Sequence, residues 1–293
     1  MNLRSPFDTP GNWYKANLHT HTTLSDGELC AAERVRQYRE KGYHILAITD
    51  HDWTNDLSGL ASQDFLVISG MERHPACDGG EAYHLVLINV PHGFDCSAEI
   101  APNAIIGMVK AVGGEVILGH PYWCGHNLNH LLPIQGAMAL EVYNATCMKI
   151  GKGLSSVQWD DLLDAGRIMP AVAVDDVHRG RDIFMGWTMI KAADLTLDAV
   201  MDALRTGCFY ASCGPVIEDA RIVEGTLTVK CSPAEVVNFI AQTSHGWSIH
   251  ADEGQQITSA EVAVSPAWKY VRVEVVGVDG KRAWTNPFIL QNG

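Results

Sequence analysis

Histidines and carboxylates recur between His19 and His178 in spacings that suit metal binding. His19-Thr20-His21 follows a short apolar approach at residues 12–18, and side chains two residues apart on extended backbone project to the same side. Two neutral imidazoles on one side are a common start to a site for a first-row metal. Asp26 fits either such a site or the N-cap of a following helix, and both interpretations stay open.

A second cluster, Asp50-His51-Asp52, directly follows the apolar run at 43–49. Three ionisable groups at the end of a buried strand cost free energy unless they are solvated or bind an ion. An ordinary polar turn is the alternative. Glu72 follows another apolar run, at 65–69, and its two carboxylate oxygens would allow it to bridge two metal ions.

Three further positions complete the pattern. His84 opens an apolar run, His120 closes one, and Asp176-Val177-His178 repeats the two-apart spacing after a third. A single histidine is more often a hydrogen-bonded core residue than a ligand. Six histidines and three carboxylates, all beside predicted strand termini, nevertheless favour one shared metal site.

Short apolar runs alternate with helix-like segments up to about residue 215. Strands are predicted at 43–49, 65–69, 84–90, 115–118, 140–143 and 169–174, and helices from an Asp26 N-cap to Gly42 and at 103–113, 159–165 and 196–205. This alternation predicts parallel strands with helical crossovers, in which chemistry collects at the carboxyl ends of the strands. The histidines and carboxylates should therefore converge in space.

The pattern changes after Gly214-Pro215. Short strand-like runs without a helical period occupy 216–222, 226–231, 236–242, 257–264 and 270–278. We predict two domains, an α/β barrel at residues 1–215 and a small antiparallel, sandwich-like β domain at residues 216–293.

Composition limits the partners of the protein. The 293-residue chain has a formal net charge of −13, which argues against nucleic acid as a partner. No apolar run approaches the roughly 18–20 residues that span a bilayer, and residues 1–18 do not resemble a secretory signal. The eight cysteines form no CxxC pair and are typical of reduced thiols. We therefore expect a cytoplasmic protein without membrane association. The sequence does not decide its oligomeric state, and a homo-oligomer is possible.

The motifs LHTHTTLSDG, AITDHDWT, the strand-end Glu72, GHPYW and VDDVH resemble those of the PHP (polymerase and histidinol phosphatase) superfamily over roughly residues 13–215. LEVYNA, WDDLLDAGR, GWT, ALRTGCFYASCGP and WTNPFIL are similar to the CehA/McbA branch of PHP-type metallohydrolases. The resemblance implies a distorted (β/α)7 barrel that holds two or three divalent ions, for which zinc, manganese and iron are equally suitable.

The resemblance also implies three ligand sets with Glu72 bridging the first two. The sets are His19, His21, Glu72 and Asp176; Glu72, His84 and His120; and Asp26, His51 and His178. His74, close to Glu72 in sequence, makes the ligand assignment in this stretch ambiguous. Asp50 and Asp175 are expected to orient ligand imidazoles.

The function that this resemblance favours is hydrolysis of a small-molecule phosphate ester by a metal-activated hydroxide. Glu72, Asp176 and His178 would act at the metal ions. His126 or His130 would assist the leaving group, and Arg179 or Arg181 would bind phosphate or carboxylate. The named branch resembles enzymes that cleave aryl carbamate esters, so a carboxylic or carbamate ester hydrolase is an alternative. A non-catalytic metal-binding or structural PHP domain is a second alternative, and the nine filled ligand positions disfavour a structural domain that has lost its ligands.

Overall fold

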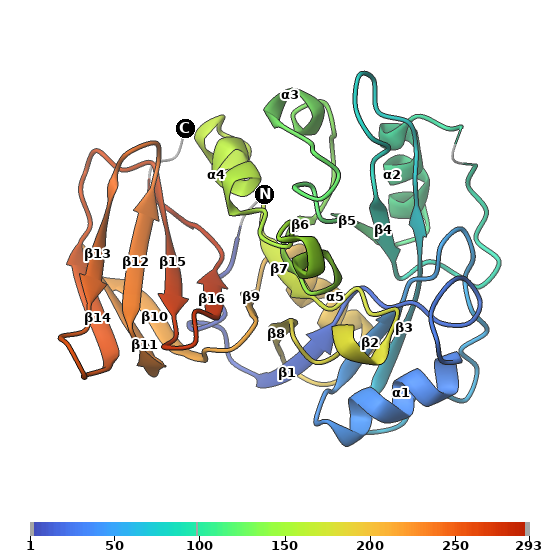
Figure 1. The fold of residues 1–293 in the computed structure, drawn as a ribbon, viewed down its shortest axis with the longest axis horizontal. Helices are drawn as coiled ribbons and strands as arrows, with labels where there is room; N and C mark the ends of the chain where they lie inside the picture. The colour runs from blue at the N-terminus through green and yellow to red at the C-terminus, as the bar shows by residue number, and fades with distance from the viewer. Residues whose placement is uncertain (1–2, 98, 291–293) are drawn as a thin grey trace.

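Seven strands lie side by side in sequence order in the computed structural model, which describes residues 3–97 and 99–290 (Figure 1). They are β1 (Asn12–Asn17), β2 (Ile45–Ile48), β3 (Leu66–Arg73), β4 (Leu85–Ile88), β5 (Glu115–Leu118), β6 (Ala139–Asn144) and β7 (Ala171–Val174). The first and last strands of this row meet beyond their carboxyl ends, where Thr20 and Val177 form a parallel bridge. His21 N donates to Val177 O at 3.1 Å, and Asp176 N donates to His19 O at 3.1 Å. The row therefore closes on itself at this end.

One strand runs against the others. β1, β2 and β3 are parallel, as are β5, β6 and β7, but β4 is antiparallel to both β3 and β5. The expectation of parallel strands throughout was wrong here. Residues 74–84, which connect β3 to β4, contain no helix, and a parallel return needs a crossover of a dozen residues or more.

Two strands that the sequence analysis did not predict extend the sheet beyond β1. β8 (Trp187–Ala192) pairs antiparallel with β1, and β9 (Phe209–Ser212) pairs antiparallel with β8. Buried and half-buried residues alternate along β8, so this strand lacks the continuous apolar run used to identify the others.

Helices flank the strands less regularly than the predicted alternation. They are α1 (Ala31–Glu40), α2 (Pro102–Ala111), α3 (Leu128–Leu131), α4 (Ser156–Asp164) and α5 (Leu197–Arg205), with 3-10 turns η1 (Thr146–Ile150) and η2 (Gly180–Asp182). α1 begins after Cys30 at its N-cap. The interpretation of Asp26 as a helix cap was therefore wrong, and Asp26 lies in the loop before the helix.

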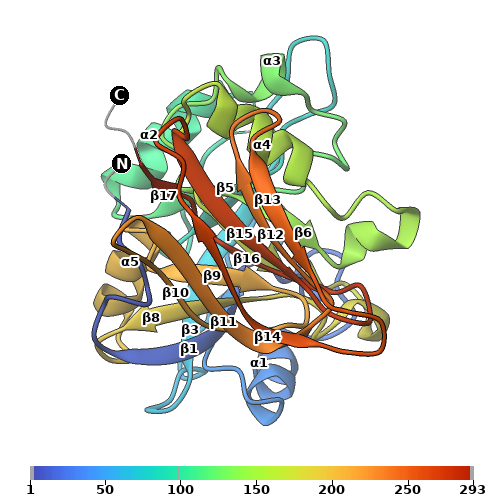
Figure 2. The same cartoon turned by 90° about the vertical axis from the view of Figure 1, so that its left-hand side faces the viewer.

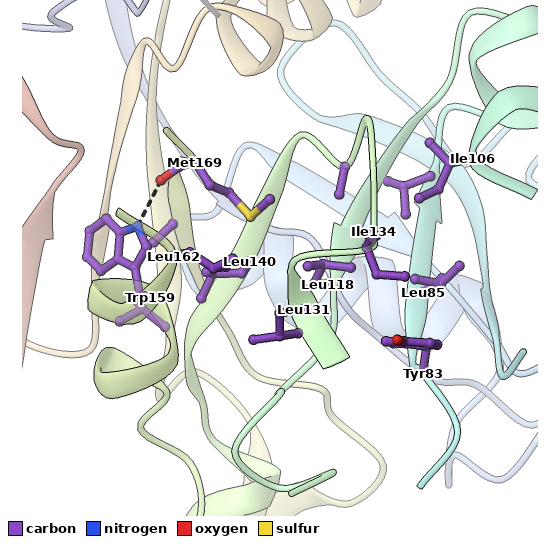
Figure 3. Packing of buried hydrophobic residues seen from close by; sticks show 14 of the residues in the cluster. Tyr83, Leu85, Ile106, Leu118, Leu131, Ile134, Leu140, Trp159, Leu162 and Met169 are labelled. Atoms are coloured by element: carbon purple, nitrogen blue, oxygen red, sulfur yellow. Dashed lines mark hydrogen bonds between the residues drawn. The ribbon is translucent and has the colours of Figure 1, made fainter. Parts of the chain in front are cut away.

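A buried apolar layer packs against β5 and β6 and fixes their positions. These two strands position residues of the site described below. Ile106, Leu118, Leu140 and Leu162 are at most 3% exposed, and Figure 3 shows them between the sheet and the helices. Burial of each such side chain stabilises the fold by roughly 1.5–3 kcal/mol. Trp159 Nε1 also donates to Met169 O at 2.8 Å (Figure 3), which ties α4 to the entry of β7.

The C-terminal quarter of the chain forms two packed antiparallel sheets (Figures 1 and 2). One contains β10 (Ile217–Val223), β11 (Thr226–Ala234) and β14 (Ile257–Ala263), and the other contains β12 (Val236–Ala241), β13 (Gly246–His250), β15 (Tyr270–Val276), β16 (Arg282–Thr285) and β17 (Phe288–Ile289). Buried Leu227, Phe239 and Val273 lie in their shared core. β16 also pairs with β9, so the second sheet continues into the barrel sheet.

These observations confirm a mixed α/β fold with a sandwich-like β unit at its C-terminal end. The division into domains at residues 215 and 216 stays a prediction. Among the described residues, no helix is both long and apolar enough to cross a membrane.

Candidate metal centre

All nine residues that the sequence predicted as metal ligands lie at one end of the barrel. They are His19, His21, Asp26, His51, Glu72, His84, His120, Asp176 and His178. Most follow the carboxyl ends of parallel strands, as expected. His84 instead precedes β4, and it reaches the same end because β4 is reversed. Glu72 lies within β3, which extends beyond β2 to bring the carboxylate into the cluster.

The first ligand set is fully buried. The Nε2 atoms of His19 and His21 are 3.1 Å apart and lie 3.3 and 3.1 Å from Oδ1 of Asp176. They lie 3.5 and 3.6 Å from Oε2 of Glu72. Two atoms that bind one tetrahedral zinc ion at roughly 2.0–2.1 Å are about 3.3 Å apart. Asp176 Oδ1 is also buried without a hydrogen-bond donor, so the donor set fits a divalent cation.

Glu72 presents its two oxygens to different imidazoles. Oε1 lies 2.7 Å from His84 Nδ1 and 3.4 Å from His120 Nε2, whereas Oε2 faces the first set. Burial alone would raise the pKa of the Glu72 carboxyl, but the charge of His19 and the close approach of the His120, His19 and His51 imidazoles outweigh it and hold that pKa well below its usual range. The carboxylate is therefore ionised and able to bridge.

The third set lies closer to solvent. Asp26 Oδ2 is 3.3 Å from His178 Nε2, and Asp26 Oδ1 is 3.5 Å from His51 Nε2. The Asp26 side chain is 53% exposed. A cation in this set would be held by fewer buried groups than one in the first set.

Glu141 and Asn144 support the ligands and were missed by the sequence analysis. Glu141 Oε1 lies 2.7 Å from His19 Nδ1, and its Oε2 accepts a hydrogen bond from His120 N at 2.9 Å. Asn144 Nδ2 donates to Glu141 Oε2 and to Asp176 Oδ2. A carboxylate within the apolar run of β6 was the available signal.

Asp50 and Asp175 do not contact ligand imidazoles, so that expectation was wrong. Asp50 accepts hydrogen bonds from Thr22 N and Ser25 Oγ at 2.7 and 2.6 Å. Asp175 accepts from Tyr38 Oη at 2.6 Å and from three backbone N–H groups at 184–186, each at 2.8 Å. Burial raises the pKa of Asp175 to about 6 against these hydrogen bonds. Both carboxylates fix loops around the site.

His126 and Arg179 do not line the cleft. His126 is 3% exposed, and its Nε2 lies 2.9 Å from the carbonyl oxygen of Glu81. Burial lowers the pKa of His126, as for a neutral core histidine with a satisfied ring nitrogen. Arg179 is exposed at the N-cap position of η2, without a side-chain cap hydrogen bond, and it is not among the residues that line the cleft.

Seven of the nine predicted ligands line a cleft of about 220 Å³, and the fully buried His19 and His21 lie behind this lining. Its lining comprises Asp26, His51, Glu72, His84, His120, Trp123, Thr146, Cys147, Lys149, Asp176 and His178. Trp123 stands edge-on to His84 and His120, with ring centroids 5.5 and 5.3 Å away. Lys149 reaches the cleft from η1, far in sequence from every ligand motif, and was missed.

A larger cavity of about 500 Å³ lies between the barrel and the second β unit, where Tyr143, Trp187 and Lys281 are among its lining residues. It contains none of the nine predicted ligands. The smaller cleft is therefore the candidate active site.

Comparison with known proteins agrees with the fold. A two-domain protein of Bacteroides vulgatus, containing a predicted PHP-like metal-dependent phosphoesterase, superposes with a TM-score of 0.56 at 15% identity, over 98% of this chain and 99% of the other. The chain thus has the fold of this PHP-like protein over nearly its whole length.

More distant matches are an amidohydrolase of Chromobacterium violaceum (TM-score 0.46, 15% identity, 57% of this chain and 89% of the other) and a lesion-specific endonuclease of Pyrococcus furiosus (TM-score 0.45, 14% identity, 66% and 56%). An uncharacterized protein of Methanocaldococcus jannaschii is 28% identical over 107 residues, which are 36% of this chain and 44% of that protein. No family model matches the chain.

Proposed function

We propose that the protein is a PHP-type, metal-dependent hydrolase of small-molecule phosphate esters. The observation that carries this proposal is the position of Glu72, whose two oxygens face separate groups of imidazoles in a buried cluster. A bridging carboxylate of this kind suits two neighbouring divalent ions. The Bacteroides vulgatus protein, which contains a predicted PHP-like metal-dependent phosphoesterase and shares the fold, supports the reaction class.

The residues of the chain have distinct roles in this proposal. His19, His21, Glu72 and Asp176 would hold one ion, and Glu72, His84 and His120 would hold a second. Such ions would lower the pKa of water in the cleft and neutralise negative charge on a phosphoryl oxygen. Glu141 keeps His19 oriented with Nε2 toward the cleft.

Lys149 favours an anionic substrate. It is the only lysine or arginine among the described residues that line the cleft, in a protein whose net charge of −13 repels anions. Its ammonium group can donate hydrogen bonds to the oxygens of a phosphate ester. This supplies the basic group that none of the ligand motifs contains.

Hydrolysis of an aryl carboxylic or carbamate ester is a second candidate, in line with the CehA/McbA resemblance. Trp123 favours it, because its ring is 36% exposed beside His84 and His120 and could stack on an aryl group. The same ions would stabilise the oxyanion of an acyl substrate. Binding without catalysis is the third candidate.

The experiment compares p-nitrophenyl phosphate with p-nitrophenyl acetate and an aryl carbamate. The chain is stripped with a chelator and then reloaded with zinc, manganese or iron. We expect phosphatase activity that disappears on stripping, returns on reloading and is absent from Glu72→Gln. Faster ester or carbamate cleavage would support the second candidate, and metal binding without any turnover the third. Failure to bind metal would refute all three and would leave a purely structural PHP domain.

The expected cytoplasmic location and the expected lack of nucleic acid partners stay predictions. Partition of the expressed protein between soluble and membrane fractions tests the first. Binding to single- and double-stranded DNA tests the second.

A further inference from the structure

His74 is not one of the nine positions that match the PHP motifs, yet it lies in the ligand cluster. It directly follows β3, two residues after Glu72, so both side chains project to the same side of the extended chain. Its imidazole packs between two predicted ligands, with ring centroids 4.9 Å from His51 and 4.2 Å from His84. Its Nε2 lies 3.5 Å from Oε2 of Glu72.

The Nε2 atom of His74 is buried and makes no hydrogen bond, although its side chain is 24% exposed overall. A buried imidazole nitrogen without a partner costs free energy, because it has given up its hydrogen bonds to water. The protein would recover this free energy if the nitrogen bound a cation. The separation from Glu72 Oε2 matches the value of about 3.3 Å for two ligands on one tetrahedral zinc ion.

We propose that His74 is a tenth metal ligand, which binds a divalent ion together with Glu72 and His51. These three residues offer ligand atoms that all lie within 4.8 Å of one another. His51 can serve this set because its Nδ1 is 2.9 Å from Glu72 Oε2 and has no hydrogen bond of its own. The inference rests on the proposed metal centre and changes which residues share its ions.

His51 would be shared between this set and the third ligand set. His51 faces Glu72 through Nδ1 and Asp26 through Nε2. If Nδ1 binds an ion with His74, then Asp26 and His178 keep only the other ring nitrogen of His51. The half-exposed Asp26 set would then be the weakest, and it would be the first to lose its ion on dilution.

The alternative is that His74 only donates a hydrogen bond that positions Glu72. Three variants separate the two roles. His74→Ala removes both functions, His74→Gln keeps an N–H donor but is a poor ligand for zinc or cobalt, and His74→Cys restores a ligand of a different kind. His250→Ala is the matched control, because it removes an exposed imidazole on β13, remote from the cleft.

The full-length chain is stripped and titrated with Co²⁺, followed by visible and near-ultraviolet absorption, and its bound Zn²⁺ is counted by elemental analysis. We expect His74→Ala and His74→Gln either to lose one ion or to bind it at least tenfold more weakly, with His250→Ala unchanged. His74→Cys should regain the ion and add a thiolate-to-cobalt charge-transfer band that the wild type lacks.

Wild-type stoichiometry and spectra in both His74→Ala and His74→Gln would overturn the inference. Recovery in His74→Gln alone would also overturn it, because the amide can replace a hydrogen bond but not a zinc ligand. Circular dichroism identifies a variant that fails to fold. In that case the other two His74 variants decide between a metal ligand and a hydrogen-bond donor. If the wild type binds no metal, the proposed function fails and this inference fails with it, whereas an effect confined to the His74 variants concerns the inference alone.

Discussion

The Glu141 carboxylate contacts both the imidazole of His19 and the backbone of His120. One carboxylate oxygen lies 2.7 Å from His19 Nδ1, and the other accepts the backbone N–H of His120 at 2.9 Å. With a proton on Nδ1, His19 presents the lone pair of Nε2 to the cleft. A single buried carboxylate thus sets the orientation of ligands from two different strands.

Glu141→Gln should therefore weaken metal binding. The amide has the shape of the carboxylate, but it lacks the charge and has only one acceptor oxygen for three donors, His19 Nδ1, His120 N and Asn144 Nδ2. Partners of this kind typically contribute 10–100-fold to metal affinity, and we expect a loss in that range by competitive chelator titration of Zn²⁺.

Glu115→Gln is the matched control for that measurement. Glu115 is 6% exposed and pairs with Lys110 and Arg205 at 2.8 and 3.0 Å, at the amino end of β5 and away from the cleft. Its replacement should lower thermal stability without changing zinc affinity. Equal affinity in Glu141→Gln and wild type would contradict the assigned role.

Lys149→Met should separate phosphate from ester substrates. Loss of one charge-assisted hydrogen bond costs about 1.5–3 kcal/mol when buried, and we expect the lower end for this exposed residue. The predicted effect is a decrease of about tenfold in kcat/KM for p-nitrophenyl phosphate, with little change for p-nitrophenyl acetate.

Lys152→Met controls for the loss of a nearby positive charge. Lys152 lies over the ring of Tyr122 at 5.7 Å and does not line the cleft. It should leave both activities unchanged. A parallel decrease on both substrates in Lys149→Met would instead indicate a change of cleft shape.

The sequence predicted the convergence of the site because it depends on local features. Each apolar run is long enough to be a buried strand. Ionisable groups beside the ends of such a strand cost free energy unless they are solvated or bind an ion. The run at 115–118 coincides with β5, and His120 follows it into the cleft. To predict that the nine ligands converge, it was enough to know which residues lie beside the ends of the strands.

The features that were missed depend on contacts between distant segments. The reversal of β4 is a property of its pairing with β3 and β5, not of its own residues. Lys149 is an ordinary surface lysine in sequence, and only the path of η1 brings it to the cleft. His126 was expected in the cleft but lies outside its lining. Nothing local in the sequence reveals that its ring nitrogen faces the Glu81 carbonyl.

Metal should stabilise the folded protein. An ion that binds only the native state adds about 2.7 kcal/mol at a free concentration 100 times its Kd. We expect Tm to rise by several degrees on addition of Zn²⁺ to the stripped chain and to fall again with chelator. Glu72→Gln should reduce this shift, and a Tm insensitive to metal and chelator would be inconsistent with a centre that binds in the folded state.

Arg272 and Asp160 join the second β unit to the barrel. Arg272 on β15 is 1% exposed, and its Nε and Nη2 donate to the two carboxylate oxygens of Asp160 on α4 at 2.7 and 2.6 Å. The guanidinium also lies 4.7 Å from the centre of the Trp159 ring. Removing one partner of a buried pair leaves an uncompensated charge, which typically costs about 3–5 kcal/mol, whereas an apolar replacement of the buried member is often near neutral.

Asp160→Asn should therefore destabilise the protein more than Arg272→Met. In the first variant the guanidinium stays buried opposite a neutral amide, while in the second the remaining carboxylate, 32% exposed, keeps access to water. Urea unfolding followed by tryptophan fluorescence measures the difference, and zinc content should be unchanged in both variants. If Arg272→Met is the more destabilised of the two, then the pair contributes net stability that an apolar side chain cannot replace, against this prediction.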